Sequence, residues 1–141
     1  MAKIVVIGAG IGGCPMAFEL KEKLGRAHDI HVVATSDWFQ FIPSNPWVAV
    51  NWRKASDVKV HLPNVFQKLG IQFSNCGVRR VTPETNSMVL GDGTTLSYDY
   101  LVIATGPKLA FDEVEGFGPD ANTVAICDTD DAGKAGIKWE E

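Results

Sequence analysis

The fold is decided by Lys3-Ile-Val-Val-Ile-Gly-Ala-Gly-Ile-Gly-Gly13. Its first five residues are apolar or β-branched after Lys3, as expected of a short strand buried on both faces of a parallel sheet. Beyond the glycines, apolar residues recur at helical spacing up to Leu24, and Gly25 follows as a residue that ends helices. A second strand is expected over residues 29–34, so the chain opens with a strand–helix–strand unit.

The glycine loop has the spacing G-x-G-x-x-G, with glycines at positions 8, 10 and 13. In this pattern the first glycine makes the tight turn, the second lets the backbone approach a pyrophosphate, and the third packs the helix on the sheet. The helix N-terminus favours an anion, because its N–H groups are unpaired and its dipole end is positive. The sequence therefore predicts a dinucleotide site formed by Gly8, Ala9, Gly10, Ile11, Gly12 and Gly13.

One part of this fingerprint is missing. An Asp or Glu is expected at the end of the second strand, where it binds the ribose hydroxyls. Here the strand ends with Ala34-Thr35-Ser36, and the nearest acid, Asp37, lies beyond it. Either Thr35 or Ser36 holds the ribose more weakly, or adenosine binding is weakened. The absence of this carboxylate argues against a simple NAD-binding domain more strongly than against an FAD-binding one.

The remaining patterns predict an α/β fold: a Rossmann-like parallel sheet with helices and a small β-meander, incomplete in this chain. We expect residues 1–109 to form the domain, with the meander at about residues 77–98. Residues 35–57 read as a long connection rich in aromatic residues and proline. Residues 110–141 are turn-rich and weakly patterned, and are expected to begin a connection to a missing second domain. The other expected elements are a helix at 62–69 and strands at 71–74, 77–82, 87–90, 95–98 and 100–104.

A second motif lies in residues 94–106, which read Thr-Thr-Leu-Ser-Tyr-Asp-Tyr-Leu-Val-Ile-Ala-Thr-Gly. It predicts a buried strand ending in a turn of small residues that can lie against a cofactor without steric conflict. Together with the upstream glycine loop and the meander between them, it resembles the A-T-G motif of flavoprotein reductases with two dinucleotide-binding domains.

The resemblance can be narrowed by residues 12–20, 39–50 and 98–108, with Asn45-Pro-Trp47 as the most specific piece. These stretches look like the N-terminal FAD-binding domain of the sulfide:quinone oxidoreductase family, and the likeness covers essentially the whole chain. It implies that FAD binds here and that the full-length enzyme passes electrons from sulfide through FAD to a quinone.

By this resemblance, the glycine loop holds the pyrophosphate and residues 34–36 approach the ribose. Pro43 lies toward the flavin, and Val78 contacts the adenine through its backbone. The turn of Ala104, Thr105 and Gly106 abuts the cofactor.

The three cysteines are Cys14, Cys76 and Cys127, an odd number without CxxC spacing. This pattern excludes a disulfide scaffold and a zinc knuckle, and no metal site is expected. Cys127 resembles one of the family's cysteines, in which a thiolate attacks or carries sulfur beside the flavin. Cys14 and Cys76 are interpreted as ordinary small apolar residues.

Composition limits the alternatives. The 141 residues are 45% hydrophobic and 21% charged, with a formal net charge of −4, which are values of a globular domain and argue against a nucleic-acid surface. No apolar run reaches the roughly 20 residues of a transmembrane helix, and no signal peptide is visible. A cytoplasmic location is expected by default, and peripheral membrane contact of the parent enzyme stays open.

Three hypotheses follow. The first is an FAD-binding part of a sulfide:quinone oxidoreductase-like enzyme, truncated and therefore inactive by itself although its parent is an enzyme. The second is a non-catalytic fragment that folds, or forms a homodimer that covers its exposed apolar face, without bound nucleotide. The third is an NAD(P)-binding dehydrogenase domain, which is disfavoured because such domains lack the A-T-G segment and normally carry the ribose acid.

Overall fold

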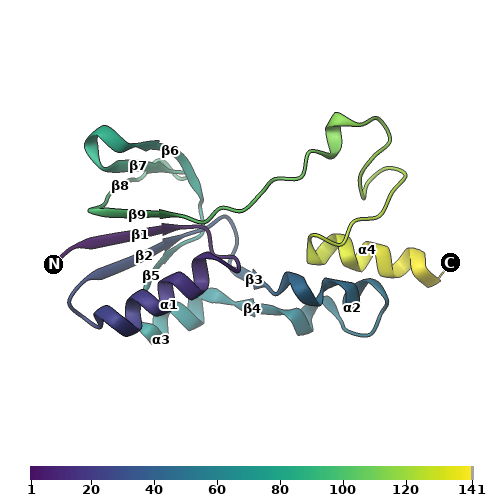
Figure 1. Cartoon of the computed structure of the whole chain (residues 1–141), viewed down its shortest axis with the longest axis horizontal. Coiled ribbons are helices and arrows are strands. Elements are labelled where there is room, and N and C mark those ends of the chain that lie inside the picture. The colour runs from purple at the N-terminus through teal and green to yellow at the C-terminus, as the bar shows by residue number, and fades with distance from the viewer. Residues whose placement is uncertain (141) are drawn as a thin grey trace. The chain divides into compact units, whose positions relative to one another are not determined.

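The chain passes three times between two compact units, as a computed structural model of residues 1–140 shows (Figure 1). Unit 1 consists of residues 1–39 and 61–106. Unit 2 consists of residues 40–60 together with the chain from Pro107 onward. Neither unit is therefore a continuous piece of sequence.

Unit 1 is built around a four-stranded parallel sheet with the strand order β5–β2–β1–β9. The central strand, β1, pairs on both sides, so that Val6 lies opposite Val32 in β2 and Val102 in β9. Residues 4–7 of this strand are buried because layers cover both faces of the sheet, which explains the continuous apolar run. The expected parallel sheet is confirmed. The strands are β1 (Lys3–Ile7), β2 (Asp29–Val33), β5 (Gln72–Ser74) and β9 (Tyr100–Ile103).

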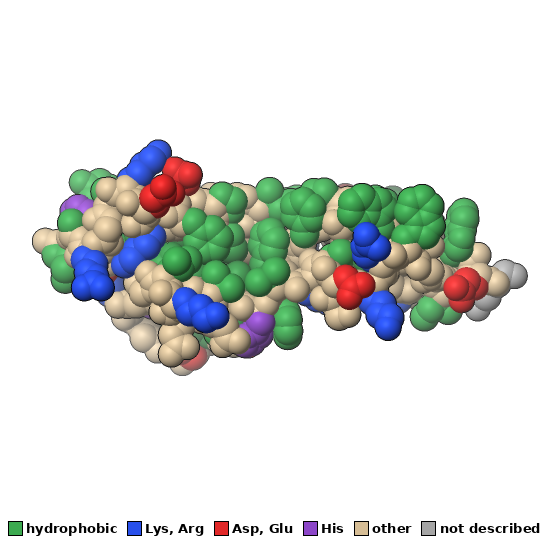
Figure 2. Space-filling model, turned by 90° about the horizontal axis from the view of Figure 1, so that it is seen from below, with side chains coloured by type: hydrophobic (Ala, Val, Ile, Leu, Met, Phe, Trp, Pro, Cys, Tyr) green, Lys and Arg blue, Asp and Glu red, His purple; other side chains and the backbone are tan. Residues whose placement is uncertain are grey.

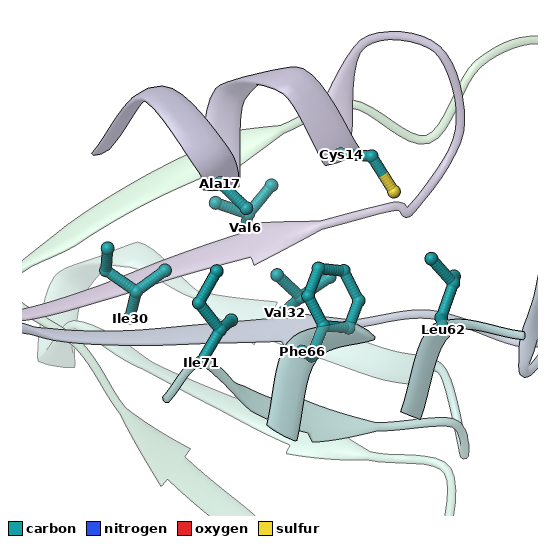
Figure 3. Packing of buried hydrophobic residues seen from close by; sticks show 8 residues of the cluster. All are labelled: Val6, Cys14, Ala17, Ile30, Val32, Leu62, Phe66 and Ile71. Atoms are coloured by element: carbon teal, nitrogen blue, oxygen red, sulfur yellow. The ribbon is translucent and has the colours of Figure 1, made fainter. Parts of the chain in front are cut away.

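Two helices cover one face of this sheet, α1 (Gly13–Leu24) and α3 (Leu62–Leu69) (Figure 1). Figure 3 shows Val6 and Val32 of the sheet packing with Phe66 of α3 in the core between these layers. Both helices end as the sequence predicts. The glycines that follow them, at positions 25 and 70, have positive φ of 57° and 65°, which side chains rarely adopt.

The β-meander covers the other face of the sheet. Val5 and Ile7 point to the side opposite Val6, since side chains alternate along a strand. They pack with Met88, which is fully buried in the middle of the meander. The meander is antiparallel with the order β6–β7–β8, as expected from the sequence. Its strands are β6 (Val78–Thr82), β7 (Ser87–Leu90) and β8 (Thr95–Ser97).

Unit 2 is held together by two helices from distant parts of the sequence. Val48 of α2 and Ala132 of α4 form its small buried core with Val58. The paired strands β3 and β4 carry the chain from unit 1 into unit 2 and back. The elements are β3 (Trp38–Gln40), α2 (Asn45–Ala49), β4 (Lys59–His61) and α4 (Thr129–Glu140), with short 3-10 turns at Ile42–Ser44, Ala55–Val58 and Phe111–Glu113.

The long connection expected over residues 35–57 contains a short helix, α2, and the weakly patterned residues after 110 contain α4; the sequence predicts neither helix. The buried face of α4 carries Ala132, Ala135 and Gly136 instead of large apolar residues, so its helical period is hard to detect. These small residues let α2 and α4 approach closely. A Cβ placed on Gly136 would lie 2.6 Å from Oδ1 of Asn51, which follows α2.

Candidate functional site

The glycine loop turns sharply at the carboxyl end of β1. Gly8 has a φ of 101°, and its N–H donates to the carbonyl oxygen of Val33 at the end of β2, at 2.8 Å. A Cβ on Gly8 would lie 2.2 Å from the carbonyl oxygen of Ala104. Only glycine fits this position, because both the backbone angle and the space exclude a side chain.

The loop packs equally tightly against the start of α1. A Cβ on Gly13 would lie 1.8 Å from the carbonyl oxygen of Gly8. The first turn of α1 is closed by the N–H of Cys14, which donates to the carbonyl oxygen of Gly10 at 3.0 Å. The loop and the helix N-terminus therefore form one rigid turn above the sheet.

In contrast to Gly8 and Gly13, Gly10 is open. It is exposed, and a Cβ placed on it would meet nothing within 4 Å. The first turn of α1 contains no acidic residue, and Gly12 at its start provides no side-chain cap. The helix N-terminus thus presents N–H groups and a positive dipole end beside free space. These features fit a pyrophosphate.

The A-T-G turn closes on the same loop. The N–H of Ala104 donates to the carbonyl oxygen of Ile7 at 2.7 Å, and its side chain would lie 3.7 Å from a Cβ on Gly12. Thr105 and Gly106 follow on the surface, and Gly106 has a φ of 68°. The structure therefore brings together the two motifs that the sequence singled out, although they lie far apart along the chain.

The end of β2 meets the start of the meander. Thr35 and Ser36 are both exposed, and Cγ2 of Thr35 would lie 2.9 Å from a Cβ on Gly77, whose φ is 69°. The N–H of Gly77 donates to the carbonyl oxygen of Ala34 at 2.7 Å, which brings Val78 close to this strand end. The residues expected at the ribose and the adenine are neighbours. Their roles stay predictions.

Pro43 and Cys127 lie in unit 2. Pro43 is exposed in the 3-10 turn Ile42–Ser44, and Cys127 is exposed two residues before α4 begins. Their assignment to the flavin and to sulfur chemistry likewise stays a prediction.

Sequence reasoning missed a polar cluster beside Cys127. Asn45 and Thr129 are both fully buried, and together with Gln40 they are linked by hydrogen bonds across unit 2. In the sequence, Asn45 stands out only as part of a family-like stretch. Its partners lie more than 80 residues away, and no local pattern signals such pairs.

Cys14 stands one residue after the glycine loop but is not available for chemistry. Its thiol is buried and donates to the carbonyl oxygen of Ala9 at 3.1 Å. Burial raises the pKa of Cys14 to about 11. The interpretation of Cys14 as an ordinary small core residue is consistent with this environment.

Among the helices of residues 1–140, none has the length and apolar character that spanning a membrane requires. No group of three or more His, Cys, Asp or Glu side chains is arranged to hold a metal ion in the described part of the chain.

A parallel sheet with a glycine loop between β1 and α1, closed by a second small-residue turn, defines a dinucleotide-binding α/β protein. The family model described as pyridine nucleotide-disulphide oxidoreductase matches residues 2–138, and the chain belongs to this family. Membership implies a flavin or dinucleotide cofactor.

Among individual proteins, the chain is 37% identical to the sulfide-quinone reductase of Aquifex aeolicus, over all of this chain and 32% of that protein. It is 34% identical to the mitochondrial sulfide:quinone oxidoreductase of Dictyostelium discoideum, over 82% of this chain and 25% of that protein. The X-ray structure of the Aquifex aeolicus sulfide:quinone oxidoreductase matches with a TM-score of 0.89, covering 99% of this chain and 32% of that one.

The predicted fold class and the resemblance to sulfide:quinone oxidoreductases are therefore confirmed. The chain spans about a quarter to a third of the length of these relatives.

Proposed function

We propose that this chain binds FAD through unit 1 and forms the FAD-binding part of a sulfide:quinone oxidoreductase-like flavoprotein. The observation that carries the proposal is the closure of the A-T-G turn on the glycine loop, where Ala104 packs against both Gly8 and Gly12. A glycine loop alone is shared by many dinucleotide-binding domains, whereas this pairing is typical of flavoprotein reductases.

Each predicted contact has a physical basis in unit 1. The open surface at Gly10 and the N-terminus of α1 suit the pyrophosphate, because the N–H groups there can donate to its oxygens. The hydroxyls of Thr35 and Ser36 would bind the ribose in place of the missing carboxylate. The backbone of Val78 would contact the adenine, and Ala104, Thr105 and Gly106 would lie along the cofactor.

For the longer protein we propose that electrons pass from sulfide through FAD to a quinone. FAD, when bound, supplies a two-electron acceptor. Cys127 would attack or carry sulfur as a thiolate, which its exposed position permits. Pro43, on the surface of the same unit, would face the flavin.

The test is reconstitution of the purified chain with excess FAD, followed by gel filtration and a visible absorption spectrum. The wild-type chain should retain a yellow flavin. Gly10→Val should lose it while keeping its fold, since the added Cβ meets no protein atom within 4 Å and the side chain enters the space proposed for the pyrophosphate. Gly133→Ala is the matched control, because Gly133 is equally open but lies in α4. A colourless wild-type chain would refute the proposal.

A second candidate is a non-catalytic domain that folds or dimerises without nucleotide. The observation that favours it is the end of β2, where Thr35 and Ser36 replace the expected carboxylate. Sedimentation of the apo chain separates the two candidates. A dimer that neither binds FAD nor dissociates on adding it supports the alternative, and a monomer that takes up FAD excludes it.

A further inference from the structure

The surroundings of Cys127 in unit 2 contain three side chains that the proposed function leaves without a role. We propose that Gln40, Asn45 and Thr129 are positioning residues that fix the backbone on both sides of Cys127 for sulfur chemistry. The inference rests on the proposed function, since it takes Cys127 as the residue that attacks or carries sulfur.

The segment before Cys127 is held by Asn45. Its side chain is 0% exposed, and its Nδ2 donates to the carbonyl oxygen of Ile126 at 2.9 Å. This contact fixes the peptide group that joins Ile126 to Cys127. It also fixes the orientation of the Asn45 amide, because the nitrogen must face that carbonyl.

The segment after Cys127 is held by the same amide and by Gln40. The N–H of Thr129 donates to Oε1 of Gln40 at 3.1 Å. The hydroxyl of Thr129, which is also 0% exposed, lies 3.0 Å from Oε1 of Gln40 and 3.0 Å from Oδ1 of Asn45. A hydroxyl donor is required here, since two amide oxygens face it and an apolar side chain would leave them without that donor.

Two side-chain amides thus anchor the residue before Cys127 and the residue two positions after it. Hydrogen bonds have preferred directions, so a satisfied buried network fixes one arrangement where apolar packing alone would allow sliding. Cys127 itself stays exposed between the anchors. The arrangement combines a fixed backbone with a sulfur open to a reactant, as a site that must place one atom requires.

The experiment measures the mobility of a nitroxide label on Cys127 by electron paramagnetic resonance, using the whole chain with Cys76→Ser. Cys14 is buried and should remain unlabelled, which mass spectrometry checks. Thr129→Val removes the hydroxyl at nearly constant shape, whereas Thr129→Ser keeps it. We expect the label to become severalfold more mobile in Thr129→Val and to stay as immobile as in the parent chain in Thr129→Ser.

Val48→Ala is the matched control for general loosening. It weakens the core of unit 2 but removes no hydrogen bond of the network. If it mobilises the label as much as Thr129→Val, or if Thr129→Ser fails to restore the wild-type spectrum, the positioning role is wrong. This readout does not depend on bound flavin, so its failure is distinguishable from a failure of the proposed FAD site.

Discussion

The two units of the molecule are stabilised in different ways. The site in unit 1 is formed by close backbone contacts. At Gly8 and Gly13 the main chain lies so near other main-chain atoms that a side chain would not fit. Unit 2 is organised by side chains, with small residues between its helices and the buried amides of Gln40 and Asn45 beside Thr129. A site determined by the backbone therefore leaves a sequence pattern that can be recognised, whereas a network of long-range side-chain contacts leaves none.

The largest expected effect is the difference in stability lost when a closely packed glycine in each unit is replaced by alanine. Gly13→Ala forces a Cβ within 1.8 Å of a backbone oxygen, so α1 or the loop must move, and unit 1 should lose about 3 kcal/mol of stability. Gly136→Ala in unit 2 meets chiefly the side-chain oxygen of Asn51, which can rotate, so its cost should be clearly smaller. Chemical denaturation followed by far-ultraviolet circular dichroism of both variants measures the difference. Equal losses would contradict the contrast between the units.

Asn45→Ala should act on unit 2 alone. It removes the donor to the carbonyl oxygen of Ile126 and one partner of the buried hydroxyl of Thr129, which should cost about 1–3 kcal/mol. Hydrogen exchange read by mass spectrometry can follow each unit separately. Faster exchange is expected in residues 124–132 and in α2, with β1 and β9 unchanged. Uniform acceleration across the chain would show that the units do not respond independently.

A smaller effect concerns how the stability of unit 1 depends on pH. His31 is buried in β2, with Nε2 2.9 Å from Oγ of Ser74, and its Nδ1 has no hydrogen-bond partner among residues 1–140. Burial, and then the positive charge of Lys3, lowers the pKa of His31. The unfolded chain therefore binds this proton at a higher pH than the folded one.

Consequently, the contribution of His31 to stability is complete above its unfolded pKa of about 6.5 and is lost as the pH falls below that value. Urea denaturation at a series of pH values should show this decline in the wild-type chain. His31→Gln removes the titrating group and should flatten that part of the curve. An unchanged slope in the variant would show that other groups cause the decline.

The smallest effect concerns the reactivity of two thiols and involves no change in stability. Cys127 is exposed, whereas burial raises the pKa of Cys14 to about 11, so only about one Cys14 thiol in a thousand ionises at pH 8. Iodoacetamide at pH 8, followed by peptide mass spectrometry, should modify Cys127 long before Cys14. Comparable rates would mean that the start of α1 opens readily.

The sequence predicts unit 1 better than unit 2, because the signals in unit 1 are local. The strand run before Gly8, the glycine spacing and the stop at Gly25 are local signals, and each corresponds to an observed element. The contact between Ala104 and the glycine loop could be anticipated only through the resemblance to a family, because no local pattern places the two turns together.

Prediction from the sequence fails where long-range contacts, and not the periodicity of apolar residues, determine the structure. α4 was missed because its buried face consists of alanine and glycine, which do not stand out from a turn-rich segment. The partners of Asn45, namely Ile126 and Thr129, are separated from it by most of the chain. Polar residues in such positions look like surface residues until the fold shows them to be buried.

The interleaved course of the chain has a consequence for biosynthesis. Residues 40–60 leave the ribosome before most of unit 1, yet α4, against which α2 packs, is made only after unit 1 is complete. At roughly 5–20 residues per second, this segment waits for several seconds with its apolar side chains unpaired. Trp47 and Trp52 belong to it, and both are partly or largely exposed even in the finished fold. Figure 2 shows hydrophobic side chains on the surface of the finished chain. During translation the nascent chain thus exposes the apolar residues of an incomplete unit 2, and such transiently exposed surface favours aggregation until α4 is made.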